Sequence, residues 1–250
     1  MVSGALPLLL VLFFTGQRNA KLDARAILSG VLIGSTMILY SAAITETTVL
    51  RAVLLFYLTP AWSILIECVF LGRKFTRWNA LAFALAATGI LLIFRGQIAL
   101  DHWNIGDVMA FASGITWAAG CSLVFTGPDI GARSLSLFGA AGAAIVGIAL
   151  SLLTGTPTPT EVNISYSAVL SLGTGTLYIG PGLIATLWSA RRLTPTTLSF
   201  LLTGEIITGI ASSALFLSEP FGWPEITGSV IIVCAALVEV VSPKPQVSNI

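Results

Sequence analysis

The chain has 250 residues, of which 56% are hydrophobic and only 9% are charged, and its mean hydropathy is +0.95. A soluble domain carries about 25% charged residues, so this composition excludes a water-soluble globular protein. The net charge of +1 provides no basic field for binding nucleic acid. The three cysteines lack CxxC spacing and the single histidine, His102, lies in a short polar stretch, so the sequence predicts no metal site and no cofactor.

Long apolar segments predict membrane-spanning helices along most of the chain. A helix needs about 20 apolar residues to cross the hydrocarbon core. The segments are too long and too continuously apolar to be the alternating strands of a β-barrel. In chain order, the predicted helices are 3–16, 26–45, 47–71, 77–95, 106–126, 134–153, 165–190, 194–218 and 224–241. The sequence therefore predicts an all-α integral membrane protein with about nine transmembrane helices.

The loops between these helices differ in their content of lysine and arginine. If successive loops alternate sides, ten basic residues lie on one side and only Arg51 and Arg95 lie on the other. Short loops rich in lysine and arginine stay in the cytoplasm, so we expect a cytoplasmic C-terminus. The same alternation places Met1 outside, although no export signal precedes it. We therefore expect one more helix upstream, with a natural nine-helix protein as the alternative.

The second half of the chain resembles the first at a constant offset. The pattern Phe-Leu-x3-Phe at 70–75 recurs at 216–221, which is 146 residues later, and the same offset pairs Thr48 with Thr194. Two copies with an odd number of helices have opposite orientations in the membrane, and such inverted repeats are typical of transporters. The predicted division is a first repeat at 1–95 that lacks its first helix, a five-helix second repeat at 106–241 and a cytoplasmic tail at 242–250.

Helix-breaking or polar residues occur near the centres of four predicted helices, two in each repeat. Irregular backbone at this depth is tolerated only where it lines a cavity or packs against protein, and transporters built from repeats bind their substrate there. The alternative is that glycine and proline are simply more frequent in membrane helices. The four positions are Gly34-Ser35, Thr59-Pro60, Gly180-Pro181-Gly182 and Gly204-Glu205.

Glu205 is the acidic residue predicted to lie closest to the membrane centre. An ionised carboxylate at that depth costs at least about 2.5 kcal/mol, so Glu205 is expected to face a polar cavity. Thr208 follows it by nearly one turn and lies on the same helix face. Two roles for Glu205 are open: proton coupling or binding of a substrate amine, and a structural role in capping the backbone freed near Gly204.

The corresponding helix of the first repeat carries Thr59, Ser63 and Glu67 at spacings of four residues, on one face. Glu67 lies nearer the cytoplasmic end and is expected to be structural, reaching lipid headgroups or Arg73. Aromatic side chains near the helix centres are candidates for the cavity wall. The predicted cavity residues are Tyr40, Tyr57, Thr59, Pro60, Trp117, Tyr178 and Pro181.

Small residues are closely spaced on two predicted helices. Gly30-x3-Gly34 and Gly139-x2-Gly142 permit close contact between helices. Such contact is expected either within the chain or between two copies of it. The sequence therefore leaves a monomer and a homodimer as alternatives.

The loop sequences at 70–75 (Phe-Leu-Gly-Arg-Lys-Phe) and 216–221 (Phe-Leu-Ser-Glu-Pro-Phe) each join a long helix to a helix rich in small residues. This unit resembles the EamA-type members of the drug/metabolite transporter superfamily. The segment Ile-Thr-Trp-Ala at 115–118 resembles the first helix of the family's second repeat. The resemblance implies ten helices in two inverted five-helix repeats, both termini in the cytoplasm, a location in the bacterial inner membrane and export of small metabolites, amino acids among them.

Aromatic amino-acid exporters of that family carry Tyr-Leu-Trp-Pro in the helix that corresponds to 47–71. This chain has Tyr-Leu-Thr-Pro there, so Tyr57 and Pro60 match the motif and the tryptophan is absent. Relatives that carry nucleotide sugars or organic phosphates need a lysine or arginine within the membrane. This chain has no basic residue near the predicted midplane, so the resemblance favours other substrates.

These observations predict a secondary transporter that exports amino acids or similar small metabolites by alternating access through a central cavity. Its partners are expected to be the small-molecule substrate, the lipid bilayer and, through Glu205, protons. An enzyme is not expected, because the membrane segments contain no Ser–His pair, paired aspartates or HExxH motif. The alternative function is that of a non-transporting membrane scaffold or a channel-like protein.

Overall fold

The computed structural model describes residues 23–47, 49–93, 103–127, 131–154, 169, 173, 177, 180–206, 208 and 222–242. Over these ranges every regular element is a helix, so the predicted all-α fold is confirmed. The predicted segment 3–16, and parts of 165–190 and 194–218, lie outside the described residues. The helices are α2 (Ala24–Glu46), α3 (Val49–Phe56), α4 (Thr59–Phe70), α5 (Arg77–Ile93), α6 (Ile105–Thr126), α7 (Ala132–Thr154), α9 (Gly180–Ala190), α10 (Pro195–Leu202) and α12 (Trp223–Val241).

The bounds of α2, α6, α7 and α12 agree with the predicted segments to within two residues. Uninterrupted apolar sequence between polar loops defines these helices. Among the described residues, three helices are long and apolar enough to cross a membrane, namely α2, α6 and the 134–153 part of α7. Three further apolar helices are shorter: α4, α5 and residues 226–241 of α12.

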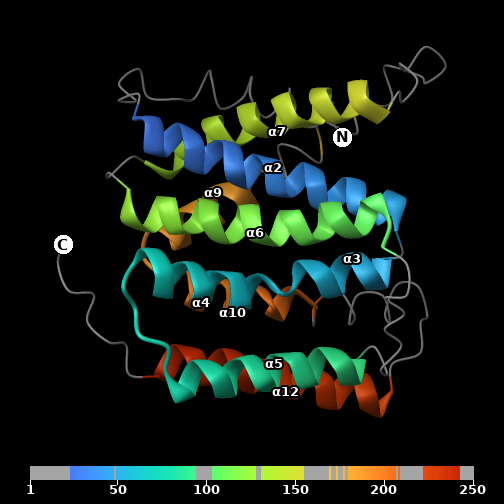
Figure 1. The fold of residues 1–250 in the computed structure, drawn as a ribbon, viewed down its shortest axis with the longest axis vertical. Helices are drawn as coiled ribbons and strands as arrows, with labels where there is room; N and C mark the ends of the chain where they lie inside the picture. Colours follow the sequence, from blue (N-terminus) through green and yellow to red (C-terminus); the bar gives the residue numbers. More distant parts are fainter. Residues whose placement is uncertain are drawn as a thin grey trace.

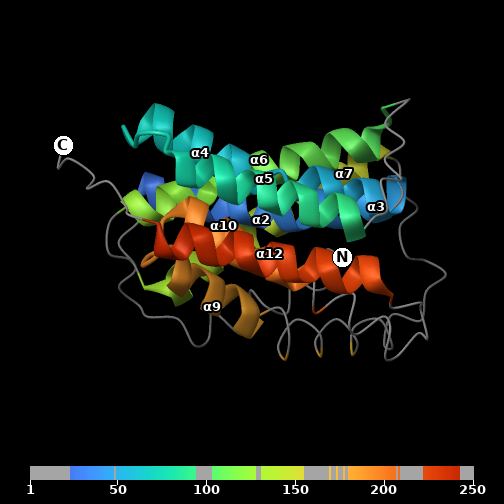
Figure 2. The same ribbon diagram turned by 90° about the horizontal axis from the view of Figure 1, so that it is seen from below.

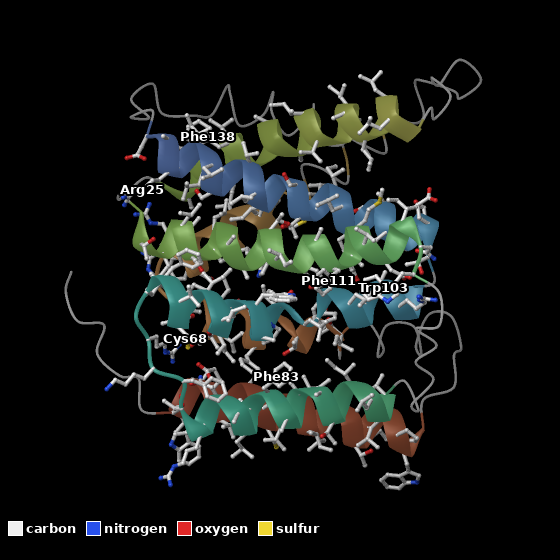
Figure 3. All side chains as sticks on the ribbon, in the orientation of Figure 1. Arg25, Cys68, Phe83, Trp103, Phe111 and Phe138 are labelled. Atoms are coloured by element: carbon white, nitrogen blue, oxygen red, sulfur yellow. The ribbon has the colours of Figure 1, made fainter. Side chains whose placement is uncertain are left out.

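The helices run along a common direction and form a bundle (Figures 1 and 2). In the bundle α2 packs against α6 and α7, α4 packs against α6 and α10, and α5 pairs with α12. Figure 3 shows Arg25 and Cys68 near one end of the bundle and Trp103 near the other. We refer to these as the Arg25 end and the Trp103 end. The basic side chains that the sequence assigns to the cytoplasmic side include Arg25.

Glycines allow two pairs of helices to approach closely. A Cβ atom at Gly34 of α2 would overlap the carbonyl oxygen of Gly139 in α7. In the α5–α12 pair, a Cβ at Gly89 would lie 2.7 Å from the carbonyl oxygen of Gly228, and a Cβ at Gly228 would lie 2.6 Å from that of Gly89. The predicted softening of the helix at Gly34-Ser35 is not seen, because α2 continues unbroken through both residues. The missing side chain serves close packing within the chain instead.

Two other helices are interrupted, as their sequences predict. A turn at Tyr57-Leu58 separates α3 from α4, and a turn at Thr203 follows α10 before helical structure resumes at 204–206. At each turn a threonine hydroxyl donates to a carbonyl three residues earlier, from Thr59 to Phe56 and from Thr203 to Phe200. These bonds satisfy backbone groups that a continuous helix would have paired.

The interrupted helices occupy equivalent positions in the two halves of the chain. Helices α3 and α10 begin 146 residues apart and end 146 residues apart, and α5 and α12 also begin 146 residues apart. This is the offset of the sequence repeat. The Gly180-Pro181-Gly182 segment is helical in α9, and residues 178–179 before it lie outside the described residues.

Candidate substrate site and two ionic clusters

Aromatic rings from α2 and α3 meet at the interruption between α3 and α4. Phe56, the last residue of α3, lies between two tyrosines: its ring centroid is 4.6 Å from that of Tyr40 in α2 and 5.4 Å from that of Tyr57. Both tyrosines are half-buried. Tyr57 also packs against the isoleucine cluster of α5, α12 and Ile206. The turn thus places a phenol group between the α5–α12 pair and α2.

Glu205 lies just beyond the second interruption and is exposed. The next residue, Ile206, packs in the same apolar cluster as Tyr57, which places Glu205 near that tyrosine. Thr208 donates its hydroxyl to the backbone carbonyl of Glu205 at 2.9 Å and leaves the carboxylate free. No hydrogen bond to that carboxylate is seen within the described residues, so the structure offers no support for its capping role. A carboxylate and two phenols can accept hydrogen bonds from an ammonium or hydroxyl group.

Several other predicted site residues are buried or packed against neighbouring helices. Thr59, Pro60 and Ser63 are buried, and the Ser63 hydroxyl lies 2.7 Å from that of Ser199, which joins α4 to α10. Trp117 is 4% exposed and belongs to a hydrophobic cluster with Ile33 and Cys121, so it packs in the core. Pro181 is exposed at the start of α9, and Tyr178 lies outside the described residues. Of the predicted set, the structure brings together Tyr40, Tyr57 and Glu205.

A buried ionic cluster occupies the Arg25 end of the bundle. The Glu67 carboxylate accepts hydrogen bonds from the Arg73 guanidinium and, at 2.6 Å, from the backbone amide of Thr196 in the first turn of α10. Arg73 also lies 3.4 Å from a carboxylate oxygen of Glu239 in α12, whose other oxygen accepts from Asn79 at 2.9 Å. The predicted structural role of Glu67 through Arg73 thus matches its contacts, and we name this group the Arg25-end cluster.

Arg73 in the α4–α5 loop keeps its charge despite this burial. Burial acts to lower its pKa, but the hydrogen bond and charge of Glu67, with those of Glu239, outweigh burial and raise the pKa above its ordinary value. The side chains of Arg73, Glu67 and Glu239 are 7%, 2% and 0% exposed. Their charges therefore interact with little screening by water.

A second ionic cluster lies at the Trp103 end. Arg51 of α3 is 2.5 Å from one carboxylate oxygen of Asp107, and the Thr47 hydroxyl donates to the other at 2.8 Å. Asn104 and Asp107 form a capping box at the start of α6, in which each side chain accepts from the other's backbone amide. We call Arg51, Asp107, Thr47 and Asn104 the Trp103-end cluster.

The sequence reasoning did not identify Phe56, Glu239, Asn79 or the Arg51–Asp107 pair. A signal existed for the charged ones, because a charge within or beside an apolar helix requires a partner. For Glu239 the pairing depends on packing, since its partners lie 160 and 166 residues away in the chain.

Comparison with known proteins finds a family similarity in the first 95 residues and a similar fold over most of the chain. Residues 1–95 match the EamA-like transporter family. Protein RarD of Salmonella typhi is 31% identical over 91 residues, and Protein RarD of Escherichia coli (strain K12) is 30% identical over 90 residues. Each match spans 36% of this chain and 28% of the RarD chain, so the similarity covers little more than a quarter of those relatives.

A solved crystal structure shows the same fold over most of the molecule. It covers 95% of this chain and 83% of its own, with a TM-score of 0.72 and 16% sequence identity. At this identity the likeness concerns the fold alone. The described part of residues 1–95, which match the transporter family, is helical like the rest of the described chain. The similarity to the EamA-like transporter family therefore concerns residues 1–95, and the likeness of fold extends over most of the chain.

Proposed function

We propose that this chain is a secondary transporter of the bacterial inner membrane that exports amino acids or similar small metabolites, with a substrate site between Tyr40, Tyr57 and Glu205. The observation that carries the proposal is the pair of interrupted helices. Each interruption contributes to one polar and aromatic site, Tyr57 from the first and Glu205 from the second. Repeat-built transporters bind substrate at interrupted helices near the membrane centre.

The chemistry of the site favours a substrate with an amino group. The Glu205 carboxylate, which accepts no hydrogen bond from the described residues, suits an ammonium group. The rings of Tyr40, Phe56 and Tyr57 suit either a cation or an apolar side chain. In the absence of substrate, the same carboxylate can take up a proton. Competition between proton and amine at Glu205 would couple export to proton entry.

The matched positions of α3 with α10, and of α5 with α12, support alternating access between two inverted repeats at 1–95 and 106–241. The family match ends at residue 95, where the proposed first repeat ends. In this proposal the two halves rock about the site, and the C-terminus lies in the cytoplasm. A homodimer is not required for the site, since all its residues come from one chain.

Counterflow of labelled amino acids in proteoliposomes tests the proposal. Saturable exchange is expected for at least one amino acid, whereas flux without saturation would indicate a channel. No detectable counterflow across a broad panel of amino acids and amines would indicate a scaffold. Either result would contradict the proposal.

Substitutions at the site test which residues act on the substrate. Glu205→Gln and Tyr57→Phe should each reduce counterflow about tenfold or more, because a hydrogen bond to a charged group contributes roughly 1.5–3 kcal/mol. Glu46→Gln, which changes an exposed glutamate at the end of α2, is the matched control and should transport normally. Loss of pH dependence in Glu205→Gln is expected for proton coupling, and pH-dependent transport that persists in this variant would rule it out.

A further inference from the structure

A pocket of about 350 Å³ opens at the Arg25 end, between the start of α7 and the residues that end α9. Its volume lies at the lower end of the roughly 300–1,000 Å³ that is typical of small-molecule sites. It shares no residue with the proposed substrate site. The lining residues are Gly131, Ala132, Trp188, Arg191 and Arg192.

Among the described residues that line the pocket, two are arginines and none carries a carboxylate. The Arg192 guanidinium stacks on the Trp188 ring at 3.9 Å from the centroid and donates to the Trp188 backbone carbonyl at 3.1 Å. These contacts hold the guanidinium in one orientation. Arginine has five N–H donors in a planar fork. The bond to the Trp188 carbonyl uses one of them, and Arg192 lines the pocket.

The opposite wall is the first turn of α7, which begins at Ala132. The first amides of a helix have no intrahelical acceptor, and the positive end of the helix dipole lies there. This wall adds to the charge of Arg191 and Arg192. All contributions have the same sign, so the pocket suits an anion, and paired guanidinium groups match the geometry of phosphate oxygens.

The pocket lies at the end of the bundle where both phospholipid headgroups and soluble cytoplasmic anions are expected. It lies at the end where we expect the loops rich in lysine and arginine, and anionic phospholipids enrich the cytoplasmic leaflet. Trp188 is 54% exposed, and tryptophan is common at the boundary between lipid and water. We propose that this pocket binds an anionic phosphate ester, with a phospholipid headgroup or a soluble glycerol phosphate as the source. This inference does not depend on the transport function.

Native mass spectrometry of the full chain in neutral detergent tests the site. Phosphatidylglycerol should bind about tenfold or more tightly than phosphatidylcholine with the same acyl chains, because the pocket selects net negative charge. Arg191→Gln with Arg192→Gln should remove this preference. Glycerol 1-phosphate is then titrated against bound phosphatidylglycerol: displacement at similar concentrations identifies a soluble source, and retention of the lipid identifies the headgroup.

The matched control is Lys74→Gln with Arg77→Gln. Both residues are exposed at the same end of the bundle, and Arg77 lies 5.8 Å from the Trp78 ring, but neither lines the pocket. This variant should keep the preference for phosphatidylglycerol. Equal binding of the two lipids, together with no binding of glycerol phosphate, overturns the proposal, as does an unchanged preference in the arginine double variant. If the double variant fails to fold, Arg192→Gln alone serves, since that side chain is exposed.

Discussion

The two ends of the bundle carry ionic clusters that differ in charge balance and in reach. The Trp103-end cluster pairs one arginine with one aspartate, and its cross-links span 56–60 residues of sequence. The Arg25-end cluster places one arginine between two glutamates and joins elements up to 166 residues apart. Arg51 is 15% exposed, whereas Arg73 is 7% exposed. An ion pair therefore contributes differently to the free energy of unfolding at each end.

The comparison shows why a count of ion pairs is a poor measure of stability. A buried charge costs free energy unless its partners compensate it. At the Trp103 end the charges cancel, and the aspartate also caps a helix. At the Arg25 end a single guanidinium compensates two carboxylates, with help from the Thr196 amide and the Asn79 side chain. Removing that guanidinium leaves two buried carboxylates without their cationic partner.

The largest expected effect is therefore that of Arg73→Gln. Loss of one partner from a buried ionic group destabilises a protein by about 3–5 kcal/mol, and here it leaves two glutamates facing each other. Thermal unfolding of the detergent-solubilised chain, followed by fluorescence-detected size-exclusion chromatography, should show a large fall in the midpoint. Adding Glu239→Gln should restore part of the loss.

Arg77→Gln is the control for this change, because Arg77 is exposed at the same end. It should alter stability by no more than about 0.5 kcal/mol. An Arg73→Gln midpoint equal to that of Arg77→Gln would show that the cluster contributes nothing to stability, and would remove the difference between the two ends.

Asp107→Asn should have an intermediate effect, of about 1–3 kcal/mol. The amide still accepts a hydrogen bond from Asn104, but it loses the charge that pairs with Arg51. Because Arg51 is partly exposed, water can solvate its guanidinium after the change. The same unfolding assay measures the effect. A loss as large as that of Arg73→Gln would mean that charge imbalance is not what distinguishes the ends.

The smallest expected effect is that of Ser63→Ala, which removes an uncharged link between α4 and α10. Hydrogen bonds between membrane helices contribute about 0.6 kcal/mol on average. A double-mutant cycle with Ser199→Ala isolates the coupling of the two hydroxyls, which lie 2.7 Å apart. A coupling energy several times larger would show that charge is not needed for a strong link between these helices.

The candidate site was predictable only in part. Tyr57 was predicted because it is an aromatic residue near a helix centre, and Glu205 because an acidic residue near the membrane centre needs polar surroundings. Trp117 was predicted on the same ground as Tyr57, as an aromatic residue on a membrane helix, yet it packs in the core. An aromatic residue on a helix gives no indication in the sequence of whether its neighbours fill the adjacent space. Phe56 was not identified because nothing local marks it.

Local chemistry was sufficient for the helices and their interruptions. Continuous apolar sequence requires internally paired backbone in a membrane, and that condition alone places α2, α6 and α7 to within two residues. Pro60 likewise marks the break before α4, because its ring prevents a regular helix through the preceding turn. These features depend on residues near one another in the chain, so they can be inferred without knowing the neighbouring helices.

Packing was needed to establish the contacts between distant segments. The absence of a side chain at Gly34 was compatible with a flexible helix or a close crossing, and the approach of α7 distinguishes them. Glu67 had a possible partner six residues away in Arg73, but Glu239 joins this pair only because α12 lies beside α5. Interactions between residues more than 100 positions apart depend on how the helices are arranged in space. The sequence of each helix is compatible with many such arrangements.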